Sequence, residues 1–600
     1  MSPAFRYTLL WAAGSTLIVI AALTMLTAGH ADGHFLPSNP DAFYHARRIL
    51  DSLFSGNPVI QFDDRIHVPE GSWLTWPWGF DTLMTSITRL FGPYANEADA
   101  NRVLMNIPPA AAPIAVGLLV IITRQLALPF LLALMLVMAF SALPLVYMLF
   151  AVGNIDHHFA ELLWTLATLS AGIRWFGTGR SSPGAAITLG CVLGSALAIH
   201  NGLFILQIPI AVTLGLLWIR GLPLPERRTI YFFAGALLAT TLLVCIPSEP
   251  WRRGFFEFYT LSWFHFYIAA CVAVFAVMLG ALTFSLRNLV ILLLAAAVAV
   301  LPIVSTLGLA GSFVSGQLAS IRGIDEAQSP YWLYSHYGES LSTRFISWMM
   351  WLSFPLLVLN LWWVFRWRDT ALQFVVISGA LGLALMQTQF RFSVFGVVPM
   401  LLTPILATRF VCDERPKLRI PALAGCAALF VIAFYPTIAN WQMRWTLGGN
   451  DAYANVSSTF PTLEKLCEER PGIVLGDLDT GHWVTYHSRC PVIADVFLLT
   501  PQHAAKAFES ARLFTMTPAQ LLKDNNQVRY VFPHHTITLE LDEKGNERPD
   551  LDEVRMGLQP LERDLLAQHP QLPPQFVQRW EVRTSQGQVY SRLYEIVRTP

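Results

Sequence analysis

The chain has 600 residues, of which 54% are hydrophobic and only 13% are charged, and it contains 39 phenylalanines and 19 tryptophans. A soluble protein carries about 25% charged residues, so this composition excludes soluble, disordered, collagen-like and coiled-coil chains and indicates a polytopic helical membrane protein. Forty basic residues balance forty acidic ones, so no net field attracts nucleic acid and we expect none as a partner.

About thirteen apolar stretches follow one another along the chain, each close to the length of a helix that crosses the roughly 30 Å hydrocarbon core. The first runs from Thr8 to Gly29, and the last runs from Ile420 to Phe434. Two long intervals between them, residues 30–102 and 308–344, are predicted to be large outer loops. Loops of this length are usually functional. The sequence therefore predicts a transmembrane domain over residues 1–438.

Basic residues in the short loops predict the orientation, because they gather on the cytoplasmic side. With the N-terminus inside, the inner loops hold about fourteen arginines and lysines, against about five in the outer loops. An odd number of spans then places the C-terminal region outside. We expect a cell-membrane protein, in the inner membrane of a Gram-negative bacterium if that is its source.

Residues 439–600 are more polar and are predicted to form an extracytoplasmic α/β domain. Its expected elements are strands at Gly472–Asp477, Pro491–Phe497 and Val528–Phe532, helices at Pro501–Leu513 and Asp550–Gln568, and a closing hairpin around Trp580–Val597. Cys467 and Cys490 lie together in this domain. They form a disulfide if the domain is extracytoplasmic, and two unpaired thiols are the alternative.

One cluster of ionisable residues stands at the outer end of the fourth predicted span, where the sequence reads D-H-H-F-A-E from Asp156 to Glu161. Helix capping by Asp156 and histidines at the level of the lipid headgroups are the plain explanation. However, Asp156 and His158 are spaced to present a carboxylate oxygen and an imidazole to one ion. A carboxylate with a single imidazole suits Mn²⁺ or Mg²⁺ better than structural Zn²⁺, so the cluster predicts a divalent metal site.

Three further residues are candidates for the same outer site. Asp41 follows Pro40 at an expected helix start, where capping alone is the alternative. Glu326 lies in the loop before the tenth predicted span, which in isolation reads as a solvated loop. Arg391 stands at the outer mouth of a span, where it either snorkels to the interface or clamps a phosphate.

Together these residues resemble the catalytic subunit of oligosaccharyltransferase, whose single-chain members are archaeal AglB and bacterial PglB and which has the GT-C arrangement of about 13 spans with a C-terminal outer domain. The stretch D-A-F-Y-H-A-R from Asp41 resembles the catalytic aspartate motif of the family's first loop. The stretch from Asp156 resembles the archaeal form of its second acidic motif. The resemblance implies that Asp41, Asp156 and His158 bind the divalent metal.

The resemblance also implies roles for the two remaining candidates. Glu326 is similar in placement to the glutamate of the fifth outer loop, which contacts the metal and the acceptor, and Arg391 resembles the arginine that holds the phosphate of the donor. It follows that Asp41, Asp156 and Glu326 are the expected catalytic residues of a metal-dependent, inverting glycosyltransferase. The implied donor is a glycan on a polyprenyl phosphate or pyrophosphate, and the implied acceptor is asparagine of an extracytoplasmic polypeptide.

One departure from the family keeps the acceptor open. The family motif W-W-D-Y-G, which binds the Ser or Thr of an Asn-x-Ser/Thr acceptor, is expected at residues 477–481, where only Asp479 and Gly481 match. Asp479 is therefore the expected acceptor-binding residue, but without the two tryptophans a GT-C enzyme that glycosylates a lipid, lipopolysaccharide or polysaccharide is an alternative. A transporter for lipid-linked sugars is a third alternative, but it would place ionisable residues near the membrane midplane.

Overall fold

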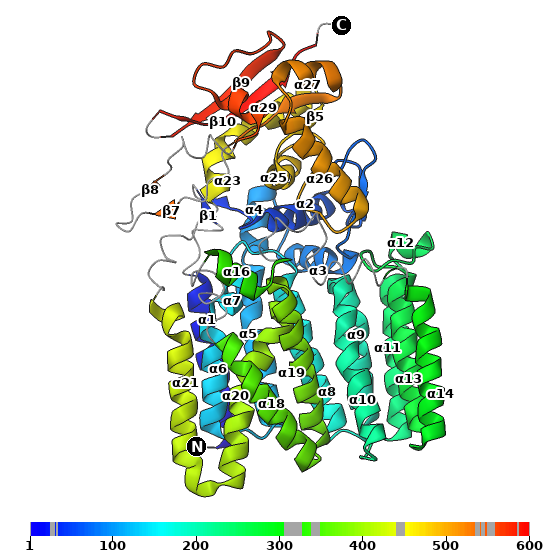
Figure 1. Ribbon diagram of the computed structural model, residues 1–600. Coiled ribbons are helices and arrows are strands. Elements are labelled where there is room, and N and C mark those ends of the chain that lie inside the picture. The colour runs from blue at the N-terminus through cyan, green and yellow to red at the C-terminus, as the bar shows by residue number, and fades with distance from the viewer. Residues whose placement is uncertain are drawn as a thin grey trace.

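The computed structural model describes residues 2–23, 30–31, 34–304, 306, 327–337, 349–439, 451–534, 540–541, 547–548, 558–584 and 587–598. A bundle of long helices forms one part of the molecule, and a domain of mixed helices and strands stands on one end of it (Figure 1). The helices α2 (Pro40–Ser55), α3 (Trp78–Arg89) and α4 (Glu97–Leu104) lie across that end of the bundle, beneath the mixed domain. The N-terminal helix begins at the opposite end of the bundle from the C-terminus.

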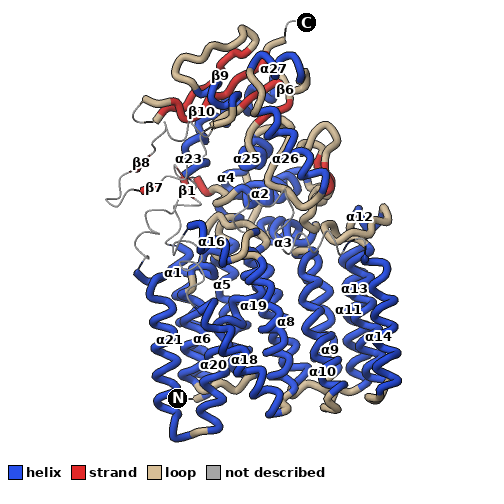
Figure 2. Tube along the Cα trace, in the orientation of Figure 1, coloured by secondary structure: helices blue, strands red, loops and turns tan. Residues whose placement is uncertain are grey.

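The bundle is helical throughout its length (Figure 2). It consists of α1 (Pro3–Leu23), α5 (Ile107–Gln125), α6 (Phe130–Ala142), α7 (Pro144–Leu149), α8 (His158–Phe176), α9 (Pro183–Ile199), α10 (Ile208–Ile219), α11 (Arg227–Cys245), α13 (Trp263–Ala281), α14 (Leu286–Val300), α18 (Met349–Trp367), α19 (Thr370–Thr388), α20 (Ser393–Glu414) and α21 (Arg419–Ala439). Within the described residues, ten helices are long and apolar enough to cross a membrane, and α6 and α9 are shorter apolar helices. The polytopic membrane fold is thus confirmed, while the number of about thirteen spans stays a prediction.

Small residues let neighbouring helices of the bundle approach closely. Gly190 and Gly194 lie four residues apart on α9 and face α11. A Cβ atom added at Gly190 would lie 2.7 Å from the carbonyl oxygen of Phe233, and one added at Gly194 would lie 2.9 Å from the backbone nitrogen of Thr241. In a membrane, where apolar burial between helices contributes little, this close backbone contact is a main source of helix association.

The C-terminal domain is built on a four-stranded sheet in the order β5 (Ile473–Leu475), β6 (Val528–Val531), β10 (Val589–Ile596) and β9 (Phe576–Arg583). Strands β5 and β6 are parallel, whereas β10 is antiparallel to both β6 and β9. Helices cover the sheet: α23 (Asp451–Val456), α24 (Phe460–Glu469), α25 (Leu478–His487), α26 (Pro501–Phe514), α27 (Pro518–Asp524) and α29 (Pro560–Leu566). The predicted α/β character and closing hairpin are confirmed, and residues 550–557 of the last predicted helix lie outside the described residues.

The predicted strand at Pro491–Phe497 is wrong. Its only ladder contact within the described residues is an isolated bridge between Val492 and Val474 of β5. The backbone N–H of Val492 instead donates to the carbonyl of Arg65 at 2.8 Å, and its carbonyl accepts from the N–H of Val68 at 3.3 Å. The apolar run of this segment therefore connects β5 to the first outer loop, a contact between distant parts of the chain that local patterning does not indicate.

Helix α2 is buried on two sides because it lies between the bundle and the C-terminal domain. Ala42, Ala46 and Ile49 belong to the apolar core of the bundle. Phe43 and Tyr44, on the other side of the helix, belong to the core of the C-terminal domain, together with side chains of α24 and α25. The two parts of the molecule are thus joined through the interior of one helix of the first outer loop.

Cys467 and Cys490 form a disulfide, and the other five cysteines of the described structure are free. The first of the two sequence-based alternatives is therefore the one that the structure adopts. The bridge joins α24 to the segment that follows α25, and both of its cysteines are buried in the core of the domain.

We expect alkylation of the denatured, unreduced protein to label five cysteines, and alkylation after reduction to label all seven. Intact-mass spectrometry measures both numbers. A Cys467→Ser variant is expected to show six labelled cysteines without reduction, because the loss of one partner exposes the other. Seven labels on the unreduced wild-type chain would contradict the disulfide.

Candidate active site

A cavity of about 140 Å³ lies at the end of the bundle beneath the C-terminal domain. Its polar lining comes from the first outer loop, α8, α9 and the segment before α20: Asp41, Thr75, His157, His158, Glu161, His200 and Arg391. Trp76, Phe204, Phe258 and Phe395 contribute apolar walls, and residues 496–499 of the C-terminal domain close one side. Three residues predicted from the sequence, Asp41, His158 and Arg391, therefore meet at one cavity.

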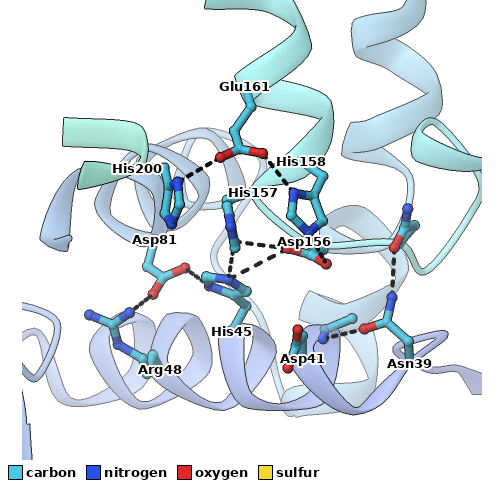
Figure 3. Close-up of polar contacts among 12 residues, drawn as sticks. Asn39, Asp41, His45, Arg48, Asp81, Asp156, His157, His158, Glu161 and His200 are labelled. Atoms are coloured by element: carbon cyan, nitrogen blue, oxygen red, sulfur yellow. Dashed lines mark hydrogen bonds and ion pairs between the residues drawn. The ribbon is translucent and has the colours of Figure 1, made fainter. Parts of the chain in front are cut away.

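The position of Asp41 depends on the way α2 begins. Asn39 caps the helix, because its side-chain oxygen accepts from the N–H of Ala42 at 2.8 Å, and Pro40 follows at the first helical position. The side-chain amide of Asn39 also donates to Asn154 at 2.9 Å, which joins the start of α2 to the loop before α8 (Figure 3). Capping is thus carried by Asn39, and Asp41 in the first turn faces the loop that carries Asp156.

Asp156 is buried among three imidazoles (Figure 3). Its carboxylate lies 2.9 Å from Nδ1 of His157, 3.7 Å from Nε2 of His158 and 3.9 Å from Nε2 of His45. Burial acts to raise the pKa of Asp156, but the neighbouring His158 and His157 outweigh it and hold the pKa well below its usual value. Burial also lowers the pKa of His157 to about 4.

A buried chain of polar contacts extends from this carboxylate into the first outer loop. Nε2 of His45 lies 3.1 Å from Nδ1 of His157, and Nδ1 of His45 lies 2.6 Å from Asp81. Asp81 also pairs with Arg48 at 2.5 Å, and the side chains of Asp81 and Arg48 are fully buried. Since a buried charge without a partner costs several kcal/mol, these contacts fix the orientation of His45 and thereby the surroundings of Asp156.

A second carboxylate holds the outer histidines. Glu161, in the first turn of α8, accepts from Nδ1 of His158 and Nδ1 of His200, each at 2.7 Å. His200 directly follows α9, which α3 approaches closely at Gly79: a Cβ atom there would lie 2.5 Å from Ala198. Glu161 thus joins the start of α8 to the residue that follows α9, at the edge of the cavity.

This region contains carboxylate oxygens and imidazole nitrogens, which are the donor atoms that divalent cations use. Because Glu161 contacts Nδ1 of His158, Nε2 is the nitrogen that faces Asp156, which is the arrangement of a histidine ligand held by a second carboxylate. Within the described part of the chain, two groups of three ligand atoms lie within 4.8 Å of one another, His45–Asp156–His157 and His157–His158–Glu161. Asp41 belongs to neither group, although it lines the same cavity as His158.

The two predicted acceptor contacts are placed differently. Glu326 lies outside the described residues. Asp479 lies in the first turn of α25 and is not among the residues that line the cavity. Burial and the neighbouring Asp477 raise the pKa of Asp479 to about 6, whereas Asp477 caps α25 and pairs with His534 at 2.9 Å. The residues around Asp479 thus form an acidic pair with one histidine in place of two tryptophans.

Sequence reasoning missed four residues of this region, namely His45, Asp81, His200 and His482. His482 of α25 is buried and places Nε2 3.8 Å from the carboxylate of Asp41, so the C-terminal domain reaches the N-terminal end of α2. His200 was detectable as a lone histidine at the outer end of an apolar helix. His45 and Asp81 are separated by 36 residues, and no local pattern indicates their pairing.

No family model matches the sequence, and neither does any curated protein sequence. Solved structures, by contrast, match over most of the chain. The oligosaccharyltransferase AglB of Archaeoglobus fulgidus, in complex with an inhibitory peptide and a dolichol-phosphate, superposes with a TM-score of 0.69 at 16% identity, over 87% of this chain and 69% of that one. The chain has the oligosaccharyltransferase fold.

Two further structures of the archaeal oligosaccharyltransferase give the same result. One, tethered to an acceptor peptide with the NVT sequon, has a TM-score of 0.67 at 16% identity, over 98% of this chain and 74% of that one. The other, a complex with Zn and sulfate, has a TM-score of 0.64 at 15% identity, over 97% and 73%. The similarity covers the bundle and the C-terminal domain together, which confirms the fold expected from the resemblance.

We expect Asp81→Asn to destabilise the protein by about 3–5 kcal/mol, because it leaves the guanidinium of Arg48 buried without a counter-charge. The midpoint of thermal unfolding in detergent, followed by tryptophan fluorescence, should fall by roughly 5 °C or more.

Asp51→Asn is the matched control. Its carboxylate is 56% exposed and lies 3.5 Å from Arg47 and 3.6 Å from Arg65, so its removal should cost less than about 1 kcal/mol. An equal fall of the unfolding midpoint in Asp81→Asn and Asp51→Asn would show that the buried contacts of Asp81 do not stabilise the site.

Proposed function

We propose that this chain is a membrane glycosyltransferase that transfers a glycan from a polyprenyl phosphate or pyrophosphate to an extracytoplasmic acceptor. The observation that carries the proposal is the convergence of Asp41, His158 and Arg391, with Asp156 behind them, on one cavity at the domain-bearing end of an oligosaccharyltransferase fold. A lipid-linked donor explains why such a site belongs on a membrane scaffold, since its tail lies in the bilayer while its headgroup reaches the cavity.

The orientation follows from the same arrangement. The C-terminal domain lies at the opposite end of the bundle from the N-terminus. This domain contains a disulfide, which is typical of an oxidising, extracytoplasmic compartment. We therefore place the N-terminus in the cytoplasm and the cavity outside, in agreement with the excess of basic residues in the predicted inner loops.

Transfer breaks the bond between the anomeric carbon and the phosphate oxygen, so negative charge develops on the leaving phosphate. Arg391, which lines the cavity, pairs with that charge in the mechanism that we propose. Asp41, which lines the same cavity, accepts a hydrogen bond from the attacking amide or hydroxyl group and aligns it for in-line attack, which inverts the anomeric centre. No side chain need form a covalent intermediate.

Asp156 and His158, with Asp41, are the residues that we propose as ligands of Mn²⁺ or Mg²⁺. When bound, such an ion would supply positive charge to the donor phosphate. Glu161 and His45 support this set of proposed ligands, because they orient the imidazoles of His158 and His157. We assign Glu326 to the acceptor side of the site by its place in the sequence.

The acceptor proposed first is asparagine of an extracytoplasmic polypeptide, as the fold favours. A lipid, lipopolysaccharide or polysaccharide acceptor is the second candidate. A specific observation favours it: in place of the two tryptophans of the sequon-binding motif stand Asp477 and Leu478, and Asp477 is engaged in the capping of α25 and in the pair with His534.

We expect the purified chain, given Mn²⁺ and native polyprenyl-linked glycans, to add a glycan to an Asn-x-Thr peptide. Asp156→Asn should lower the rate at least about 100-fold, the usual cost of removing an electrostatic contact to the transition state. Mass spectrometry of the peptide and of the donor measures both products. Asp64→Asn, which changes an exposed carboxylate of the first outer loop, is the control and should retain the wild-type rate.

The two acceptor classes give different outcomes. A bare peptide with Asp156-dependent consumption of the donor would assign the acceptor to lipids or polysaccharides. Donor that remains intact with every class of acceptor, at a metal concentration that saturates the protein, would contradict a glycosyltransferase.

A further inference from the structure

A second and larger cavity, of about 980 Å³, lies at the end of the bundle opposite the C-terminal domain. It is bounded by the C-terminal ends of α5 and α8, the turn after α8, and the linker between α18 and α19. Each of these four segments contributes one arginine to its lining: Arg124, Arg174, Arg180 and Arg368. The transfer reaction proposed above uses none of them.

Four arginines and one carboxylate, that of Asp369, line this cavity. In the part of the chain that the structure describes, no ion pair joins any of the four arginines to a carboxylate. The one carboxylate of the lining, Asp369, is occupied as the cap of α19, where it accepts from the N–H groups of Ala371 and Leu372 at 2.9 and 3.0 Å. Four arginines against one carboxylate in the lining of a shared cavity therefore favour an anionic ligand.

The linker between α18 and α19 has an unusual backbone conformation at one of the arginines of the cavity. Arg368 has a φ of +58°, in the left-handed region that side chains other than glycine rarely adopt. Strain of this kind persists only where the surrounding structure imposes it, and it is concentrated at binding sites and turns with a function. Here it occurs at Arg368, which lines the same cavity as Arg124 and Arg174.

The remaining lining indicates which anion fits. Ile121 of α5 lies on the cavity wall with 46% of its surface exposed, and Ile173 and Ala371 are further apolar contributors. The cavity sits where the bundle helices end, which is the depth of the headgroups of one leaflet. Basic pockets between transmembrane helices at this depth typically bind lipid headgroups.

We propose that this basic cavity binds the phosphate headgroup of an anionic membrane lipid, with its acyl chains along Ile121. An excess of arginines on the cytoplasmic side is expected of any membrane protein, and this is the plain alternative. The two explanations differ in one respect. If the cavity is a binding site, the affinity for the lipid depends on the arginines of the cavity. If a general charge bias is the cause, every arginine at this end of the bundle contributes equally to that affinity.

Arg227 and Arg228 provide the matched control, since they lie at the same end of the bundle and outside the cavity. Their guanidinium groups lie over the rings of Tyr231 and Phe232, at 5.6 and 5.5 Å from the ring centroids. The test compares Arg174→Gln/Arg368→Gln with Arg227→Gln/Arg228→Gln in the full-length protein in detergent. Native mass spectrometry during a titration with phosphatidylglycerol measures the affinity for the lipid.

We expect the cavity variant to bind phosphatidylglycerol about 25-fold more weakly than the wild type, that is, about fivefold per arginine, and the control variant to bind as the wild type does. Equal losses in both variants would overturn the proposal in favour of general surface charge. If the first cavity variant fails to fold, Arg124→Gln/Arg180→Gln is tested against the same expectation. Binding of inorganic phosphate with the same affinity as phosphatidylglycerol would also overturn the proposal, because the site would then take a soluble anion.

Discussion

The structure depends on the contacts between buried polar side chains of α2 and carboxylates of neighbouring elements. This helix is enclosed by the bundle on one side and by the C-terminal domain on the other, so its polar side chains have little access to water. Arg48 and His45 are buried and share Asp81, and Arg47 is buried against Asp63 at 2.8 Å. Since unpaired charges in such surroundings would cost several kcal/mol each, the helix can occupy this place only in the one register that satisfies these pairs.

That register determines the geometry of the cavity. With α2 held by Asp81 and Asp63, its first turn presents Asp41 to the loop before α8, and Asn39 joins the two segments directly through Asn154. The same helix carries Phe43 and Tyr44 into the C-terminal domain, and α25 of that domain returns His482 to Asp41. The position of the C-terminal domain and the position of the candidate catalytic carboxylate are therefore set by one element.

Several residues of the candidate site could be proposed from the sequence because they lie in short motifs at helix ends. Asp156, His158 and Arg391 stand where an apolar stretch begins, and a charge there requires a reason that local spacing can supply. The contacts of His200 with Glu161 and of Asp81 with His45 could not be predicted, since they join segments far apart in the chain. The burial of α2 on two sides could not be predicted either, because apolar residues on two faces of a short helix indicate no single partner.

The same distinction explains the errors of the sequence-based description of the C-terminal domain. Strands β6, β9 and β10 alternate or bury residues in the manner of ordinary sheet strands, and they were predicted. The segment at Val492 has equal apolar content, but its hydrogen bonds are directed to Arg65 and Val68 of the first outer loop. Apolar content alone does not distinguish a strand from a segment that packs between two domains.

The central claim is that Asp41, Asp156 and His158 together hold a divalent ion beside Arg391. Anomalous diffraction at the manganese edge, from crystals grown with Mn²⁺, tests it most directly. The account predicts a single peak at about 2.0–2.5 Å from carboxylate oxygens of Asp41 and Asp156 and from Nε2 of His158. A peak between His45 and His157 instead, or no peak at a concentration of Mn²⁺ that supports transfer, would contradict it.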